Sequence, residues 1–416
     1  MAKYRFLISL AAAGALLPSA SLAFESLPEF QGVTEEEQEN FDRPNLLGGE
    51  FLNRVLSYQK PYDWEYHWLT HDVAVDGTVG SISSVHFLIE SRAKIRAYLN
   101  DWLQFRFTWF EESNHERSTL KPVFELVAWP TKKLGLSLYG DVTYFKRNDD
   151  VGFALLYKPQ DRHEIRLFNT YVDLTRQKRN DRTDTFLDLP YSRGLVGRIW
   201  SAEDREFFEY AVRYETKTTW RFPDQGYDYK YWKYFASVFG SRKLNERLRL
   251  NGRIQLDRRF EARSPFTAST VSSQAWRTDR ITAIVETPVG EIGPDGQWTL
   301  TPGLLYGYRN WLTDDDHLQY NDYIPFARLR IPTGEGAQRS SWEFSYQLAW
   351  HRKRGGQVIA LPTDLDGALN HQYNIAYTFA FKEKAELKLL AGFDGDKFGT
   401  GDSWEGGNAQ LRIFLD

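Results

Sequence analysis

The sequence predicts an all-β fold, a transmembrane antiparallel up-and-down β-barrel of about 18 strands, with 16 strands as the alternative. Three observations lead to this prediction: many aromatic residues in a polar chain, a long series of segments with period-two alternation, and an N-terminal segment typical of export. The 416 residues include 14 Trp, 23 Tyr and 28 Phe, yet the mean hydropathy is -0.54. A barrel wall in lipid needs apolar residues on one face only, with aromatic residues at both interfaces.

The composition excludes several other classes of protein. Apolar residues make up 42% and charged residues 26% of the chain, which excludes disorder as a description of the whole. The absence of cysteine excludes disulfides, thiolate zinc sites, iron–sulfur clusters and cysteine nucleophiles. A formal net charge of -4 gives no indication of a nucleic-acid partner.

Residues 1–23 have the three parts of a secretory signal peptide. Lys3 and Arg5 are basic, 6–17 is a short apolar run, and Ser21 and Ala23 are small residues suited to cleavage before Phe24. An N-terminal membrane anchor is the alternative, but the apolar run is too short to span a bilayer comfortably. Because no later stretch has 18 or more apolar residues, we expect no transmembrane helix after it.

Alternation with period two runs through most of the remaining chain. In 247–257, apolar Leu248, Leu250, Ile254 and Leu256 alternate with charged or polar residues. A helix cannot keep one apolar face with this period because its own repeat is 3.6 residues. A soluble β-sandwich could, but its strands are usually shorter than these segments, and here the apolar face often ends in Trp, Tyr or Phe.

The alternation and the turn signals divide the chain into strands and joins. We expect strands near 85–98, 102–113, 120–129, 134–146, 151–159, 163–176, 185–200, 205–219, 228–240, 247–260, 274–288, 297–311, 318–332, 340–352, 371–382, 385–395 and 406–416. Short joins mostly alternate with longer ones, as periplasmic turns alternate with outer loops in such barrels, and 353–370 falls on the outer side. An even strand number with both ends periplasmic requires one more strand, for which 64–76 is the candidate.

The segment before the barrel has a different character. Residues 24–61 are expected to form a periplasmic N-terminal extension or partial plug, with Thr34 and Glu37 in a capping-box pattern for a short helix. A disordered leader before the first strand is the alternative. The predicted organisation is thus a signal peptide (1–23), this extension (24–61) and the barrel (62–416).

An export signal followed by amphipathic strands to the last residue resembles the Gram-negative outer-membrane β-barrel class, over roughly 62–416. Such barrels often end in alternating apolar residues with a terminal aromatic residue. Here Ala409, Leu411, Ile413 and Leu415 supply the alternation, but the chain ends in Asp416 and places Phe414 on the opposite parity. The resemblance implies a porin-like channel in the outer membrane, with membrane lipid and the barrel assembly machinery as partners. It assigns no particular family.

If the apolar face of each strand contacts lipid, the polar face, formed by the alternate residues, lines the lumen. The predicted pore-lining residues are Arg92, Lys94, Arg96, Arg106, Arg247, Arg249, Arg253, Arg259, Arg328, Arg330, Glu90, Asp257 and Glu343. So many charges require water or ionic partners, which indicates a wet lumen in a barrel of this size. Rings of arginine select anions in pores, so anionic solutes are one hypothesis. The alternative is that the arginines pair with carboxylates on neighbouring strands and only stabilise the wall.

Aromatic residues near the polar parity allow a second hypothesis for the lumen. Trp232, Tyr234, Phe168 and Tyr139 beside arginines could form a path for sugars. Packing against the wall or a plug is the plainer interpretation of the same residues.

Enzyme signatures are weak by comparison. The sequence contains no HExxH, GxSxG or P-loop motif, and we predict no catalytic residue, no metal site and no cofactor. His67 and His71 have a spacing that makes a metal pair on a helix, but on the predicted strand they would lie about 13 Å apart. The acidic run Asp314, Asp315 and Asp316 is expected to be a solvated turn, with Ca²⁺ binding as the alternative.

Three classes of function therefore remain. The favoured one is an outer-membrane channel for small polar solutes, with anionic ones as the hypothesis above. The second is a barrel sleeve or exit duct of a larger export or electron-transfer assembly. The third is a lipid-modifying barrel enzyme, which would need a Ser and a His at the outer rim. A homo-oligomer or an assembly partner is compatible with the first two.

Overall fold

A computed structural model describes most of the chain after residue 61. It covers 62–83, 86–114, 118–141, 149–172, 185–188, 191–203, 205–223, 226–266, 273–293, 297–313, 317–333, 340–355, 369–381, 384–401 and 403–415. The expected signal peptide, the expected extension over 24–61, the acidic run 314–316 and most of the loop 353–370 lie outside these residues. Among the residues described, no helix is long and apolar enough to cross a membrane.

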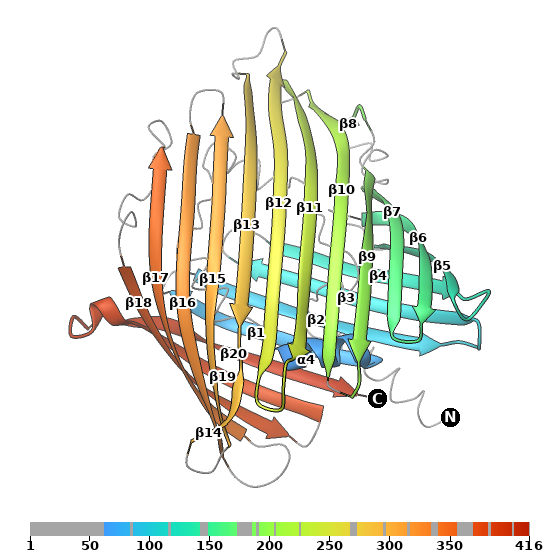
Figure 1. Ribbon diagram of the computed structural model, residues 1–416. Coiled ribbons are helices and arrows are strands. Elements are labelled where there is room, and N and C mark those ends of the chain that lie inside the picture. The colour runs from blue at the N-terminus through green and yellow to red at the C-terminus, as the bar shows by residue number, and fades with distance from the viewer. Residues whose placement is uncertain are drawn as a thin grey trace.

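One helix precedes a continuous series of strands (Figure 1). The helix α4 spans Tyr62–Thr70, and a 3₁₀ turn, η4, spans Gly395–Lys397. The first strands are β1 (Val73–Ser83), β2 (His86–Tyr98), β3 (Leu103–Asn114), β4 (Ser118–Ala128), β5 (Leu134–Asp141), β6 (Asp149–Gln160), β7 (His163–Val172), β8 (Thr185–Phe186), β9 (Tyr191–Ser201) and β10 (Glu206–Phe222). The others are β11 (Tyr227–Lys243), β12 (Arg249–Pro265), β13 (Gln274–Glu286), β14 (Val289–Ile292), β15 (Trp298–Thr313), β16 (His317–Thr333), β17 (Ser340–Gly355), β18 (Leu369–Phe381), β19 (Ala385–Asp394) and β20 (Trp404–Leu415).

The strands close into a barrel of 18 antiparallel strands. Each long strand pairs with the next along the chain, and β1 pairs with β20 from Val73 opposite Leu415 to Ser81 opposite Gly407. The short strands β8 and β14 are outside this circuit, because β7 pairs directly with β9 and β13 pairs with β15. The predicted fold class and strand number are confirmed, and the alternative of 16 strands is excluded.

The predicted first strand, 64–76, is wrong for most of its length. Its first part is the helix α4, and the strand β1 starts at Val73. Tyr62, Tyr66 and Leu69 of α4 pack with Phe207 of β10. In Figure 1 the helix lies at the lower end of the barrel, between the strands of the near and far walls. The expected ascending strand is therefore β1, and the chain enters it from a helix inside the barrel.

The outer face of the barrel is apolar between two aromatic belts. On β17, Trp342 packs edge-on against Tyr377 at one end, and Trp350 lies 5.6 Å from the ring of Tyr323 toward the other. The two tryptophans are about 26 Å apart along the strand, which suits a tilted crossing of a bilayer. Exposed Phe344 lies between them. Because an apolar belt of this height must face lipid, the chain is a multi-pass β-barrel of the outer-membrane type.

The wall is not equally tall all round. The strands β10, β11, β12 and β16 have 17 residues each, whereas β5 has 8 and β7 has 10. A strand of 17 residues is roughly 56 Å long, and a tilted membrane crossing needs only about 9–11 residues. In Figure 1 the strands β10, β11 and β12 reach farther than β5, β6 and β7 at the end opposite to α4 and the C-terminus. We call the end with α4 and the short turns the periplasmic end, and the tall end the outer end.

Candidate functional site

Charged side chains line the inner face of the barrel, and many are buried. Lys94, Arg166, Arg213, Glu215 and Asp322 are each at most 2% exposed. Such groups are tolerated away from water only when they are paired and hydrogen-bonded. The partners of these charges therefore decide what the interior can do.

Three predicted pore-lining residues, Arg92, Lys94 and Arg96 of β2, hold the helix α4. Arg92 forms ion pairs with Asp76 of β1 at 2.5 Å and with Glu65 of α4 at 3.1 Å. The Lys94 ammonium group donates to the carbonyl oxygen of Trp68, and Arg96 donates to the carbonyl oxygen of Leu69 at 2.8 Å. Basic groups on the last carbonyls of a helix satisfy acceptors that have no partner within the helix.

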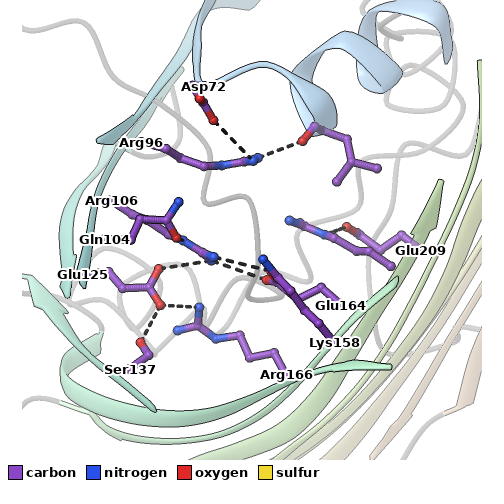
Figure 2. A network of polar contacts seen from close by, with 12 residues as sticks. Asp72, Arg96, Gln104, Arg106, Glu125, Ser137, Lys158, Glu164, Arg166 and Glu209 are labelled. Atoms are coloured by element: carbon purple, nitrogen blue, oxygen red, sulfur yellow. Dashed lines mark hydrogen bonds and ion pairs between the residues drawn. The ribbon is translucent and has the colours of Figure 1, made fainter. Parts of the chain in front are cut away.

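A network of ionic contacts continues from Arg96 around the wall at the periplasmic end (Figure 2). Arg106 of β3 reaches Glu164 of β7 at 3.4 Å and Glu125 of β4 at 3.9 Å. Glu125 also pairs with Arg166 at 2.6 Å. We call this set the periplasmic network; it consists of Asp72, Arg96, Gln104, Arg106, Glu125, Ser137, Lys158, Glu164, Arg166, Arg198 and Glu209.

A second set of charges lies on the inner face of the tall wall, nearer the outer end. Lys233 of β11 pairs with Asp257 of β12 at 2.6 Å, and Arg309 of β15 pairs with Asp322 of β16 at 3.5 Å. His351 of β17 contacts the same Asp322 at 2.7 Å. We call this set the upper cluster; it consists of Lys233, Asp257, Arg259, Glu261, Arg280, Arg309, Asp322 and His351.

Both sets contain like charges placed directly opposite each other on paired strands. Arg96 is in register with Arg106 in the periplasmic network. In the upper cluster, Lys233 is in register with Arg259. Arg280 is in register with Arg309 in the same cluster. Like charges opposite each other destabilise a sheet, so these pairs depend on carboxylates nearby or on a bound anion.

The other predicted pore-lining residues occupy several environments. Arg328 pairs with Glu286, Lys388 with Glu343 at 2.7 Å, and Arg259 with Glu261 at 3.2 Å. These contacts agree with the alternative in which arginines pair with carboxylates of the wall. The guanidinium of Arg253 lies over the ring of Phe239, Arg330 donates to Ser341, Arg249 donates to Ser241, and Glu90 is in register with Thr78 and Glu112.

Arg247, the first residue of the strand predicted near 247–260, is not on a strand. It lies in the turn between β11 and β12, and its largely exposed side chain pairs with Glu291 at 2.6 Å. The strand begins two residues later, at Arg249. Arg247 therefore contributes to the periplasmic rim and not to the inner face of β12.

The inner face also carries an apolar area that the alternation did not predict. Val127 and Leu156 are completely buried, and both pack in a cluster with Tyr139 and Phe168. Two of the four aromatic residues considered for a sugar path, Tyr139 and Phe168, are thus inside and buried. The other two, Trp232 and Tyr234, were misplaced: they lie on the outer face with Phe260, as described below.

The two histidines of the predicted first strand come together because that segment is helical. The rings of His67 and His71 lie 5.1 Å apart, and both contact Phe414. In the part of the chain that the structure describes, no group of three or more His, Cys, Asp or Glu side chains is arranged to hold a metal ion. The arrangement is an aromatic contact between α4 and the last strand.

The fold resembles several solved structures of outer-membrane proteins at low sequence identity. A loop L8 deletion mutant of OmpT, an outer membrane protein of Vibrio cholerae, is 11% identical with a TM-score of 0.36, over 82% of this chain and 97% of that chain. The outer membrane protein OpdK from Pseudomonas aeruginosa is 8% identical with a TM-score of 0.39, over 82% and 97%. A bacterial polysaccharide outer membrane secretin is 8% identical with a TM-score of 0.39, over 83% and 100%. No protein-family model matches the sequence, and the search of curated proteins found no match.

Proposed function

We propose that the protein is an outer-membrane channel for small anionic solutes. The observation that carries the proposal is the set of three like-charge pairs on the inner face: Arg96 with Arg106, Lys233 with Arg259, and Arg280 with Arg309. A structural wall gains nothing from bases in direct register, because opposite charges at those positions would stabilise it. A surface that receives anions does gain from them, because each pair offers two cationic groups to one solute.

The carboxylates beside these pairs support the same function. Glu164 is shared between Arg106 and Lys158, and Asp322 is shared between Arg309 and His351. Shared carboxylates offset the repulsion between the bases without neutralising them all. Weak, repeated sites of this kind suit conduction, because a solute must be able to leave each site as well as enter it.

The two sets of charges lie at different heights, which supports a path rather than a single site. The periplasmic network joins the lower ends of β2–β10, and the upper cluster lies nearer the outer end of β11–β17. A solute that crosses the barrel would meet the upper cluster first on its way inward. The helix α4, bound to β2 through Arg92, lies at the periplasmic end of such a path.

Ion selectivity in planar bilayers tests the proposal. The purified protein is expected to conduct, and the reversal potential in a KCl gradient should show a preference for chloride. The double variant Arg280→Gln/Arg309→Gln should shift that potential toward cation preference. The matched control is Arg258→Gln, which removes one base from the outer face of β12 and should leave the reversal potential unchanged.

Two outcomes would overturn the proposal. The first is cation preference in the wild-type channel. The second is the absence of channel conductance for protein that is fully inserted and heat-modifiable on gels. That result would favour a barrel that surrounds a partner.

A further inference from the structure

The outer face of the tall wall changes from apolar to basic near the outer end. On β12 the exposed residues Ile254 and Leu256 are followed, on the same face, by Arg258. On β17 Trp350 is followed by Arg352 and Arg354. The same change on two strands that are separated by three others shows that it follows a level of the barrel rather than a single strand.

Aromatic contacts mark the level at which the change occurs. Trp232 of β11 stacks on Phe260 of β12, with 4.7 Å between centroids and 11° between planes. Basic groups lie against aromatic rings on this face. The Lys217 ammonium is 5.6 Å from the ring centre of Trp232, and on β17 the Arg352 guanidinium is 4.6 Å from the ring centre of Trp350. Aromatic belts lie at the headgroup level of a membrane, so these two bases lie at that level or just above it, whereas Arg258 lies two residues below Phe260 on β12.

Basic side chains gather on this face across β10–β17. We call them the outer collar; they are Lys217, Arg221, Lys230, Arg258, Arg277, Arg352 and Arg354. The acidic side chains in register among them are Asp228 and Asp279. The bases therefore outnumber the acids in this described part of the outer face.

Asp279 holds two of these bases side by side. Its carboxylate contacts Nε of Arg258 at 2.5 Å and Nε of Arg277 at 3.1 Å, and it accepts a hydrogen bond from Asn310 at 3.2 Å. Asp279 is buried, whereas the side chains of Arg258 and Arg277 are 52% and 35% exposed. Both contacts use Nε, so the two partly exposed guanidinium groups lie side by side on the outer face of the barrel.

We propose that the outer collar binds the phosphate groups of a phosphorylated glycolipid in the outer leaflet of the membrane. Guanidinium groups bind phosphate through paired charge-assisted hydrogen bonds, and ammonium groups attract it as point charges. The apolar residues below the collar, such as Ile254 and Leu256 on β12, would contact the acyl chains of the same lipid. Tall strands explain the placement, because they carry the collar beyond the hydrocarbon layer to the level of the headgroups.

Lipid retention measured by native mass spectrometry tests this proposal. The intact protein is reconstituted with bis-phosphorylated lipid A, with the same lipid A after removal of its phosphates, or with a zwitterionic phospholipid. The wild type should retain bis-phosphorylated lipid A most strongly. The variant Arg258→Gln/Arg277→Gln/Arg352→Gln should retain it about 100-fold less, at roughly fivefold for each base at a membrane surface.

Controls separate this binding from general effects of charge and folding. The lumenal variant Arg280→Gln/Arg309→Gln should retain lipid A as the wild type does, and the three Arg→Lys changes at the collar should retain part of the binding. Equal retention of dephosphorylated lipid A would overturn the proposal, as would full retention by a folded collar variant. If inorganic phosphate at millimolar concentration displaces lipid A, the site binds a free anion instead. That result would also contradict the proposal of a lipid-binding site.

Discussion

Phe414 of the last strand stacks on His67 of the lumenal helix, with 4.4 Å between ring centroids and 6° between ring planes. His71 lies against the same ring at 4.6 Å, and Trp68 and Ala74 complete the contact. The inward position of Phe414 accounts for its parity, which is opposite to that of Leu411, Ile413 and Leu415. An inward-facing aromatic residue thus joins the helix α4 to the closing strand.

Replacing Phe414 by leucine tests whether this stack holds α4. The change keeps an apolar side chain but removes the ring, so about 1 kcal/mol of aromatic contact should be lost. We expect faster cleavage of α4 by proteinase K, at Tyr62–Thr70, with the barrel itself still resistant. The matched control is Ile413→Leu on the neighbouring, lipid-facing position. Equal protection of α4 in wild type and Phe414→Leu would show that the stack is dispensable.

Among the residues that attach α4 to the wall, Arg92 is expected to cause the largest loss of stability when it is replaced. It pairs with Asp76, which is 2% exposed, and with Glu65 of α4. Arg92→Met leaves these carboxylates without their shared base, and breaking a buried pair in this way costs about 3–5 kcal/mol. Urea unfolding in lipid vesicles, followed by tryptophan fluorescence, measures the loss.

A second variant separates lost charge balance from lost packing at Arg92. Glu65→Gln/Asp76→Asn/Arg92→Met removes all three charges together, so no buried carboxylate is left uncompensated. This triple variant should recover much of the stability that Arg92→Met loses. If the triple variant is as unstable as Arg92→Met, the contribution of Arg92 comes from packing against Trp68, 4.2 Å from its guanidinium, and not from charge.

The alternation of the sequence was sufficient for the wall but not for the helix before it. Leu248, Leu250, Ile254 and Leu256 could only share a face in a strand, so the strand was predictable. The segment of α4 also alternates with period two, because Tyr62, Trp64, Tyr66 and Trp68 are separated by polar residues, so the pattern alone favours a strand there. Its helical state depends on contacts with β2, where Lys94 and Arg96 donate to its last carbonyl oxygens, and a single sequence does not reveal such contacts.

The lumenal site was predictable in composition but not in pairing. Parity placed Arg106 and Arg259 inside. The partner of Arg259 is Glu261 on the same strand, but the partner of Arg106 is Glu164, four strands away, and that contact follows from the curvature of the barrel wall. Parity also cannot tell where a strand leaves the membrane. Arg258 lies on the lipid-facing parity because the wall at β12 is taller than the bilayer, so a base on that face meets headgroups instead of hydrocarbon.

Glu164 provides a test of selectivity independent of the upper cluster. It is the carboxylate shared by Arg106 and Lys158 at 3.4 and 3.6 Å. Glu164→Gln should make the periplasmic network more positive and increase the preference for anions. At about 10 Å from a permeating ion, one charge in water is worth roughly 0.4 kcal/mol, or about a twofold change in permeability ratio.

Reversal potentials in a KCl gradient measure this effect in the single-channel experiment. The opposite change, Arg106→Gln, should lower the anion preference by a similar factor, and Glu291→Gln at the periplasmic rim is the control. A shift of the same sign in Glu164→Gln and Arg106→Gln would indicate that the network acts through its geometry and not its charge. In that case permeating ions do not respond to the network as proposed.

Closure of the barrel between β1 and β20 depends on glycine at position 406. Gly406 has a φ of +128°, and a Cβ atom there would lie 2.4 Å from the carbonyl oxygen of Ser81 on the opposite strand. Alanine would be strained in this conformation and would push the strands apart at the outer end. We expect Gly406→Ala to lower the yield of folded barrel, with a cost of about 1–3 kcal/mol from overpacking alone.

The heat-modifiable fraction after refolding into lipid vesicles measures that yield. Gly252→Ala is the matched control, because a Cβ atom at Gly252 would make only an ordinary contact of 3.7 Å with the carbonyl oxygen of Ile284. The control should fold as the wild type does, since β12 is not at the seam between the first and last strands. If Gly406→Ala folds equally well, the two strands tolerate a wider separation at that level, and closure depends on the pairing from Val73 to Val79 instead.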